Sequence, residues 1–484
     1  VQEDEHGNVA LVEDTTELPH VFHDAETLIQ LCRTQDKSIA QIMMENEKYW
    51  RTEDYLSIAA GAALGAVGTV AADFDLFRFK KDSGIHFDVD LKHCAASLNS
   101  HKYSRANGKA HGKLWDEFSG FYRCSDSRWI QLHCNYPHHR RNVLDALGLP
   151  ESASRKDVES EIYQNTAEHW ENELTSKDCC VSFVRTVCEW RKHPQFIAIS
   201  ALPLLDITKI GDSPAEVGAT SDTAFPLSGI KVLDLSRVLA GPVGCKLMAQ
   251  LGADVLKIVA EHLPYVHSLV PDTNIGKRST FIDIRTPAGK SKLLELVKQS
   301  DVFFQAYRPG ALAQKGFSPE DLALIRPGII YVSLSAYSHE GIWSFKRGFD
   351  SLVQSATGIV DTQSKYEGLE ATDVPVHWPV SAQDYICGFL SAFATISALK
   401  RRAVDGGSYH VRISLSQTGH WISSLGRSPF TPDKALEEND IRAFLDTIQS
   451  EWGLLQYLKP VLQIPGYSPT PPKPLGSDLP NFLT

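Results

Sequence analysis

From Pro226 onward, short runs of largely apolar residues alternate with segments of helical spacing. The apolar runs lie at 231–235, 254–258, 281–284, 301–304 and 329–333, and a further strand is expected at 410–415. Segments with apolar residues at helical spacing lie at 243–251, 287–299, 319–325 and 383–402. Apolar strands joined by helical crossovers are typical of a parallel sheet covered on both faces. The pattern therefore predicts an α/β fold with a doubly wound, Rossmann-like parallel sheet.

Residues 54–205 carry a different pattern, which predicts a smaller α+β domain. The stretch from Leu56 to Ala72 has no charged residue in 17 positions and consists mostly of alanine and glycine. It is shorter than the roughly 20 residues of a membrane span, and alanine and glycine contribute little to transfer into lipid. We therefore expect a closely packed interior helix there, followed by a short strand at 87–91 and an aromatic hairpin at 120–133.

Changes in composition divide the chain of 484 residues, which is long enough for more than one hydrophobic core. The expected parts are an N-terminal helical extension (1–53), the small-domain segment (54–205), a linker rich in Ser, Asp, Pro and Thr (206–225), the Rossmann-like domain (226–425) and a C-terminal helix with a proline-rich tail (426–484).

Overall composition narrows the class of protein. Hydrophobic residues make up 43% of the chain and charged residues 22%, as in soluble globular proteins. The net charge of −11 argues against a nucleic-acid partner, and the first residues do not resemble a secretory signal. Nine cysteines without a C-x-x-C pair favour a reducing, cytoplasmic location and argue against a disulfide framework. We also expect no metal site and no membrane partner. Four histidines, His20, His23, His138 and His139, are expected at the surface.

The first strand–helix turn of the predicted sheet, 234–242, matches neither the dinucleotide fingerprint nor the P-loop. Cationic side chains nevertheless follow several of the predicted strands, among them Lys277, Arg278, Arg308 and Lys346. Arginine and lysine suit phosphate groups, and open α/β sheets bind ligands at the carboxyl ends of their strands. The sequence therefore indicates a site for a phosphorylated ligand at this edge of the sheet.

Five motifs stand in order in this half of the chain: G-I-K-V-L-D-L-S-R-V-L-A-G-P (229–242), L-G-A-D-V-L-K-I (251–258), N-I-G-K-R-S (274–279), Y-R-P-G (307–310) and G-F-D (348–350). Together they resemble the class III CoA-transferases, the CaiB/BaiF family of formyl-CoA transferase, carnitine CoA-transferase and α-methylacyl-CoA racemase. The resemblance implies an acyl-CoA and a carboxylic acid as substrates, with no tightly bound cofactor.

The resemblance also implies roles for individual residues. The family's nucleophile is an aspartate at the start of a long helix, which Asp384 matches in S-A-Q-D-Y-I-C-G (381–388). Because the free amides and dipole of a first helical turn stabilise an anion, we expect Asp384 to be ionised at neutral pH. The expected contacts to CoA are Arg237, Ala240, Lys257, Asn274, Lys277, Arg278, Arg308 and Lys346. The segment with Ser335, Tyr337 and Gly341 is expected to supply backbone amides to the oxyanion.

Residues 54–205 resemble the part of the family that normally follows the nucleophile helix. The hairpin and the His193-Pro-Gln195 segment resemble its small domain, and Asp54-Tyr55 resembles a second copy of the nucleophile site. The order of the two parts is thus reversed, which indicates a circular permutation or a remnant of fused copies. Known members form interlocked ring dimers, so the resemblance implies a homodimer or a ring closed within one chain.

Two activities of this family make different demands on the site. The racemases use a histidine in G-H-D, and this chain has Phe349 there, which cannot carry a proton. His339 could replace that histidine only if its loop folded over the thioester, and we expect it to be exposed. Leu239 stands where formyl-CoA transferase has glutamine, which argues against formate and oxalate. The favoured activity is acyl-CoA:carboxylate CoA transfer through an aspartyl-CoA thioester; racemisation, and acyl-CoA binding without turnover, stay open.

Overall fold

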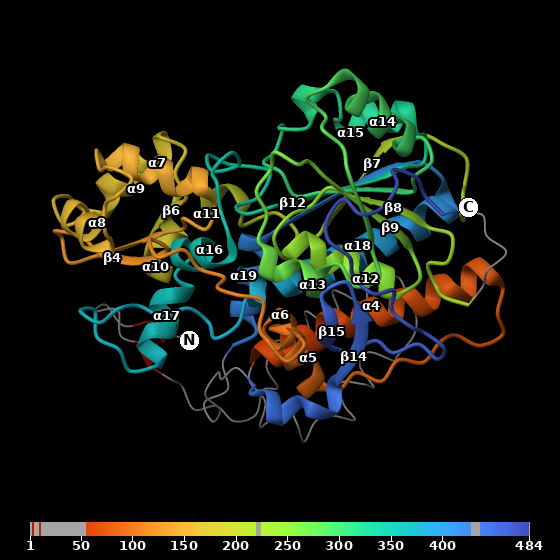
Figure 1. Ribbon diagram of the computed structural model, residues 1–484, viewed down its shortest axis with the longest axis horizontal. Helices are drawn as coiled ribbons and strands as arrows, with labels where there is room; N and C mark the ends of the chain where they lie inside the picture. Colours follow the sequence, from red (N-terminus) through yellow and green to blue (C-terminus); the bar gives the residue numbers. More distant parts are fainter. Residues whose placement is uncertain (1, 4–8, 11–54, 219–223, 427–435, 484) are drawn as a thin grey trace.

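The computed structural model describes residues 2–3, 9–10, 55–218, 224–426 and 436–483 (Figure 1). Within the expected N-terminal extension, β1 (Gln2–Glu3) pairs antiparallel with β2 (Val9–Ala10). The expected helices of that extension, and the positions of Asp54, His20 and His23, lie outside the described residues.

A seven-stranded sheet forms the centre of the large domain (Figure 1). Its strands are β7 (Asp206–Gly211), β8 (Lys231–Asp234), β9 (Asp254–Val259), β10 (Arg278–Phe281), β11 (Val302–Gln305), β12 (Ile330–Ser335) and β13 (Ser408–Ser414). Their spatial order is β10-β9-β8-β11-β12-β13-β7, and only β7 runs antiparallel to its neighbour. Counted from β8, the parallel strands have the Rossmann order 3-2-1-4-5-6. The predicted doubly wound sheet is confirmed.

Helices cover both faces of this sheet (Figure 1). On one face lie α14 (Pro287–Val297) and α15 (Pro319–Ile325), whose leucines pack against Leu233 and Phe303. On the other lie α12 (Ala240–Gln250), α18 (Ala382–Asp405) and α4 (Tyr55–Phe79), which share a core with Val232 and Phe304. Neighbouring residues of a strand point to opposite faces, so β8 and β11 are buried on both sides.

Glycines allow α12 and α18 to approach closely. A Cβ atom on Gly244 would lie 2.4 Å from Ser391 Oγ and 2.7 Å from the Gly388 carbonyl oxygen. A Cβ atom on Gly388 would lie 2.6 Å from the Ala240 carbonyl oxygen. Because only hydrogen fits at these two positions, the start of α18 lies beside the first turn of α12, immediately after β8.

The alanine-rich helix α4 completes this layer. By length and composition it could cross a membrane, but 78% of its most apolar window is buried inside the protein. Ala59, Ala63 and Val67 are completely buried, and the helix packs along α18. The closely packed interior helix expected at Leu56–Ala72 is therefore what the structure contains.

The small domain lies to one side of the large one (Figure 1). Its antiparallel sheet consists of β4 (Gly120–Arg123), β5 (Trp129–Leu132) and β6 (Val181–Phe183), and its helices are α7 (Pro137–Leu147), α8 (Arg155–Ile162) and α9 (Ala167–Ser176). These elements enclose a separate core that contains Phe118, Ile130 and Trp170. The predicted aromatic hairpin is confirmed as β4 and β5.

Shorter helices connect these parts. α10 (Val187–Lys192) and α11 (Pro194–Ile199) follow the small domain, and η1 (His267–Leu269), α13 (Val270–Thr273) and η2 (Ala313–Lys315) lie between strands of the large sheet. α16 (Asp350–Ala356) and α17 (Ile359–Tyr366) precede α18, and α19 (Leu415–Ser424) follows β13.

Three expectations about the smaller elements differ from the structure. The strand expected at 87–91 is absent, because Asp90 accepts a hydrogen bond from the His93 amide (2.9 Å) and so caps α5 (Leu91–Ser97). With α6 (Ser100–Tyr103) and β3 (Arg105–Ala106), α5 belongs to the large domain rather than to the small one. In place of a C-terminal α-helix, the described residues form η3 (Glu438–Phe444) and the hairpin β14 (Leu445–Ser450)–β15 (Gly453–Leu458), which pairs with β3.

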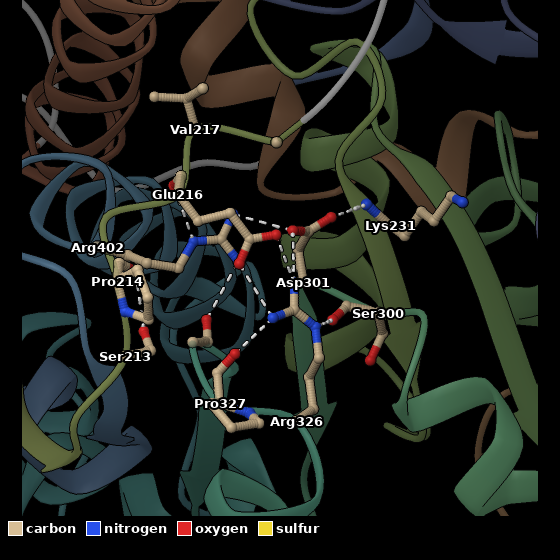
Figure 2. A network of polar contacts seen from close by, with 12 residues as sticks. Ser213, Pro214, Glu216, Val217, Lys231, Ser300, Asp301, Arg326, Pro327 and Arg402 are labelled. Carbon is tan, nitrogen blue, oxygen red and sulfur yellow. Dashed lines mark hydrogen bonds and ion pairs between the residues drawn. The ribbon is translucent and has the colours of Figure 1, made fainter.

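The expected linker at 206–225 begins as β7, and Glu216, which follows it, belongs to a partly buried ion-pair network. Figure 2 shows Arg402, at the end of α18, and Arg326 converging on Asp301 and Glu216. Arg402 Nη2 lies 2.9 Å from Asp301 Oδ1, and Arg326 Nη2 lies 2.7 Å from Glu216 Oε1. Glu216, in the segment that follows β7, is thus held against the sheet edge opposite the strands' carboxyl ends.

Candidate active site

A cleft of about 290 Å³ opens at the carboxyl ends of β8 and β11. These two strands are the point at which the strand order reverses, the usual ligand site of open α/β sheets. Residues that follow β8, β11 and β12 form one wall, among them Arg237, Arg308 and Ser335. The start of α7, from the small domain, forms the other wall. Both domains of a single chain therefore build the cleft.

Asp384 lies in this cleft, in the first turn of α18. The Gly388–Ala240 contact brings that turn beside the start of α12, and Ala240 and Gly241 line the cleft next to it. Among the described residues that line the cleft, Asp384 is the only carboxylic acid. The carboxyl group of Asp384 therefore lies where a ligand at the carboxyl edge of the sheet could reach it.

The electrostatic environment of Asp384 differs from the expectation. Burial raises the pKa of Asp384 well above its ordinary value, and the neighbouring Asp350 carboxylate raises it further. Asp350 Oδ2 accepts the Asp384 backbone N–H at 2.9 Å, so Asp350 uses the amide that was expected to stabilise an Asp384 anion. Burial also raises the pKa of Asp350 to about 6. The raised pKa of Asp384 and the use of its amide by Asp350 do not support the expected anion stabilised by its own helix.

Two arginines that line the cleft, Arg308 and Arg347, form ion pairs with Asp178 of the small domain. Arg308 Nη1 and Arg347 Nε lie 3.1 Å and 2.8 Å from Asp178 Oδ1, so one carboxylate balances two guanidinium groups. Arg237 lies over the Tyr136 ring, 5.1 Å from its centroid. The cleft therefore carries an excess of positive charge at its surface.

Lys346 also lines the cleft but is buried in an ion pair between the domains. Its Nζ lies 2.8 Å from Glu171 Oε1 and 3.9 Å from the centroid of the Trp343 ring. Arg185 pairs with the same carboxylate. Burial alone would raise the pKa of Glu171, but Lys346 and Arg185 lower it to about 2. Lys346 thus fixes the small domain to the cleft wall.

A smaller pocket adjoins the cleft and shares Arg237, Val238 and Tyr307 with it. Two expected CoA contacts, Lys257 and Asn274, line this second pocket. The Asn274 Oδ1 atom is buried and has no hydrogen-bond partner in the described part of the chain. Of the expected contacts, the structure therefore brings Arg237, Ala240, Arg308, Lys346 and Ser335 to the cleft, and Lys257 and Asn274 beside it.

Four of the expected site residues line neither pocket. Lys277 is buried against Asp234 (2.9 Å), and Arg278 pairs with Asp254 (2.8 Å) and with the carbonyl of Asn481 in the C-terminal tail. Tyr337 is buried behind the loop, where its carbonyl accepts a hydrogen bond from Gln195 Nε2 (2.7 Å). Gly341 lies against the Gln195 side chain. These positions do not support a direct contact to a ligand in the cleft.

The sequence analysis missed several residues of the cleft. His138 and His139, expected at the surface, line it together with Tyr136, Tyr307 and Arg347, and His139 is 2% exposed. Phe349 lines it too and is stacked on His133, with ring centroids 3.8 Å apart. The sequence signal for these histidines was the Y-P-H-H segment (136–139) that follows β5. Whether this segment lines the cleft depends on how the small domain docks. His339 is half-buried and does not line the cleft.

No group of three His, Cys, Asp or Glu side chains suited to a metal ion occurs among the described residues. Seven buried cysteines of the described ranges are free thiols: Cys94, Cys124, Cys134, Cys179, Cys180, Cys245 and Cys387. The chemistry that the cleft offers is that of one carboxylic acid, several cations and neutral imidazoles.

The chain matches the sequence model of CoA-transferase family III at residues 44–206 and 227–431. It therefore belongs to this family, as the five motifs indicated. It is 31% identical to the acetyl-coenzyme A transferase nodX of Hypoxylon pulicicidum over 378 residues, which cover 74% of this chain and 62% of that protein. It is 30% identical to an acyl-CoA transferase of Gibberella moniliformis, with 62% of this chain and 55% of that one covered.

Similarity to other curated relatives is confined to shorter segments. The succinate–glutarate CoA-transferase of Agrobacterium fabrum is 31% identical over 208 residues, which cover 39% of this chain and 51% of that protein. A solved structure of the hypothetical protein Rv3272 from Mycobacterium tuberculosis superposes with a TM-score of 0.37 at 27% identity, over 42% of this chain and 58% of that one. The chain thus spans less than two thirds of the length of these relatives.

Proposed function

We propose that this protein transfers CoA from an acyl-CoA thioester to a carboxylic acid, with Asp384 as the nucleophile. The observation that carries the proposal is the position of Asp384, the single carboxylic acid among the described residues of the cleft. It lies at the reversal point of the sheet, beside cationic side chains that suit the phosphates of CoA. The names of the relatives, which are CoA-transferases, support the same class of reaction.

The reaction proceeds through exchanges between carboxylates and the CoA thiolate. The Asp384 carboxylate attacks the thioester carbonyl, and the C–S bond breaks to give a mixed anhydride and CoA thiolate. The thiolate then attacks the aspartyl carbonyl, which releases the donor acid and leaves an aspartyl-CoA thioester. The acceptor carboxylate attacks this thioester, and the released thiolate takes the acceptor acyl group from the second anhydride. Covalent catalysis of this kind replaces one difficult exchange by several easier steps.

The surroundings of Asp384 determine when the first step can begin. Only the ionised carboxylate attacks, and its pKa is raised by burial and by Asp350. A carboxylate with a raised pKa is more basic, and therefore a better nucleophile once its proton has left. We assign hydrogen bonds to the tetrahedral oxyanion to backbone amides close to Ser335 and Ala336, because these two residues line the cleft.

Binding of CoA uses the cationic rim. Arg237, Arg308 and Arg347 suit the diphosphate, because guanidinium groups bind phosphate oxygens in pairs. The adjoining pocket with Lys257 and Asn274 shares Arg237 with the cleft and extends the site. Arg308 and Arg347 would then exchange their partner Asp178 for the incoming phosphates.

Isotope exchange tests the proposal. The protein is incubated with acetyl-CoA and ¹⁴C-labelled acetate, and with succinyl-CoA and labelled glutarate, and the thioester is examined for label. Hydroxylamine added during turnover traps an aspartyl thioester as the hydroxamate of Asp384, which mass spectrometry locates. We expect exchange in the wild-type protein and a loss of about 10³-fold or more in Asp384→Ala.

Asp212→Ala, which removes a side chain that is 96% exposed, is the matched control and should leave exchange unchanged. Exchange that survives Asp384→Ala would refute the assignment of the nucleophile. Incorporation of solvent deuterium at the α-carbon without CoA transfer would identify a racemase instead, and binding of acyl-CoA with neither reaction would identify a non-catalytic protein.

A further inference from the structure

The wall of the cleft that the small domain supplies contains a histidine with no apparent structural task. The chain leaves β5, reaches Tyr136 and enters α7 with Pro137 as its first residue. His138 and His139, in the first turn of α7, line the cleft together with Phe349 and Asp384 from the large domain. The two domains thus place an imidazole and the reactive carboxyl group in one cavity.

His139 is almost completely buried, with 2% of its surface exposed. Its Nδ1 atom has no hydrogen-bond partner among the described residues. Its ring contacts three aromatic rings, with centroid distances of 5.2 Å to Tyr136, 4.2 Å to His138 and 5.8 Å to Phe349. A buried polar atom without a partner costs folding free energy, whereas an apolar ring of the same shape would not. Packing alone therefore gives no reason for a histidine here.

The imidazole is uncharged in this environment. Burial, together with His138 and Arg347, lowers the pKa of His139 to about 3. A neutral imidazole has one N–H donor and one acceptor nitrogen, so it can pair with a hydroxyl group or donate to a carboxylate oxygen. It cannot act as a strong base at neutral pH, which separates it from the histidine of the racemases.

We propose that His139 is a substrate contact that hydrogen-bonds an oxygen atom on the acyl chain and thereby makes the cleft selective for oxygen-bearing acyl groups, such as hydroxyacyl or carboxyacyl chains. The inference rests on the proposed function, since it assigns the acyl group bound at Asp384. A site built to pair with a polar substituent discriminates strongly against the analogue that lacks it, because the buried partner is then left unsatisfied. An alkyl chain of equal length would leave the buried Nδ1 atom of His139 without a hydrogen-bond partner.

Two pairs of probes test this selectivity, 3-hydroxybutyryl-CoA against butyryl-CoA and succinyl-CoA against butyryl-CoA. The dissociation constant of each probe and of free CoA is measured by calorimetry in the Asp384→Asn background, and kcat/KM for exchange is measured in the active protein. We expect at least one oxygen-bearing probe to be preferred over butyryl-CoA by about tenfold or more. His139→Phe should abolish this preference, while free CoA and butyryl-CoA bind as before.

Two further variants separate recognition from structure. His139→Gln retains a donor and an acceptor and should restore the preference to within about threefold of wild type. His169→Phe changes an exposed histidine of α9 in the same domain and should change nothing. The melting temperature of His139→Phe should be equal to or above that of the wild type, since an unpaired polar atom is removed.

The outcomes are distinct. The inference is overturned if wild type shows no preference between the probes, if His139→Phe keeps the preference, or if His139→Phe and His139→Gln both weaken free CoA. If wild type binds the probes selectively through His139 but catalyses no exchange, the inference stands and the proposed transferase activity fails. If exchange occurs without selectivity, the proposed transferase activity stands and the inference about His139 fails.

Discussion

At the scale of single residues, the site depends on two carboxyl groups held close together. Asp384 faces the cleft, and Asp350 accepts its backbone N–H from behind. Each disfavours ionisation of the other, because like charges in a buried site repel. The protein therefore holds its proposed nucleophile at a raised pKa, and activity should depend on pH in a range where an ordinary aspartate is already ionised.

The first prediction concerns this pH dependence. Exchange should rise with pH through the raised pKa of Asp384, and Asp350→Asn should shift the acid limb of the profile to lower pH by removing the neighbouring charge. The pKa values are raised in the folded state, so the stability that Asp350 contributes is present below about pH 4 and is lost as pH rises through about 6, and the contribution of Asp384 changes in the same direction.

Two measurements check the sign. The first is the profile of kcat/KM against pH for wild type and Asp350→Asn. The second is the melting temperature of Asp384→Asn relative to wild type, which should increase between pH 4 and pH 8. A difference in melting temperature that is flat or decreasing over this range would contradict the raised pKa.

At the scale of elements, the contact between α12 and α18 decides where Asp384 lies. Gly244 and Gly388 let the two helices touch backbone to backbone, and the first turn of α18 is thereby held at the switch point of the sheet. The same contact is part of the largest hydrophobic core. The same pair of glycines therefore contributes both to the position of α18 and to the stability of the core.

The second prediction follows from this contact. Gly244→Ala should destabilise the protein by about 1–3 kcal/mol and reduce exchange, since a Cβ atom would clash with Ser391 Oγ and the Gly388 carbonyl and force α18 away. Gly65→Ala is the matched control, because that buried helical glycine of α4 has open space at its Cβ position and helix propensity favours alanine. Urea titrations and exchange assays on both variants check the prediction, and equal effects would contradict it.

At the scale of the whole molecule, one chain supplies both walls of the cleft. Glu171, Arg185 and Lys346 form a buried ion-pair cluster across the two domains, and Lys346 lines the cleft at the same time. Docking of the small domain and assembly of the site are therefore coupled.

The third prediction tests that coupling. Glu171→Gln should destabilise the protein by about 3 kcal/mol or more, because it leaves Lys346 and Arg185 without their counter-charge. The pKa of Glu171 is lowered in the folded state, so its contribution is present above about pH 4.5 and is lost as pH falls towards about 2. Urea unfolding followed by tryptophan fluorescence, which reports on Trp343, measures both effects.

Glu173→Gln is the control for that measurement. Its carboxylate, on the same helix, pairs with Lys177 at the surface, and such pairs contribute little to stability. If the two variants were equally stable at neutral pH, or if Glu171→Gln kept the wild-type acid dependence, the cluster would not hold the domains together.

Much of the fold could be predicted because its central strands β8, β9, β11 and β12 are largely buried and rich in apolar residues. The two edge strands are exceptions. β7 has exposed residues and was expected as part of a linker. The strand expected at 281–284 is β10 at Arg278–Phe281, whose polar residues bond to Asp478 and Asn481 in the tail. Such long-range partners leave no local pattern. The expected interior helix and the aromatic hairpin were predictable because their own residues define them, without long-range partners.

The candidate site was predictable only in part. A motif identified Asp384, but nothing in the local sequence shows that Lys277 and Arg278 are taken by Asp234 and Asp254. The histidines after β5 become cleft residues only when two segments far apart in the chain are docked. The role of each cleft residue remains a prediction that the experiments above address.

The position of α4 in the chain has a consequence for biosynthesis. This apolar helix ends at Phe79, whereas its partner α18 is complete only at Asp405. A ribosome that adds roughly 5–20 residues per second would hold the emerging helix without its packing partner for tens of seconds. Throughout that interval the uncharged stretch of this helix, Leu56 to Ala72, is open to aggregation, so newly made chains should depend on a chaperone that shields it until the C-terminal half emerges.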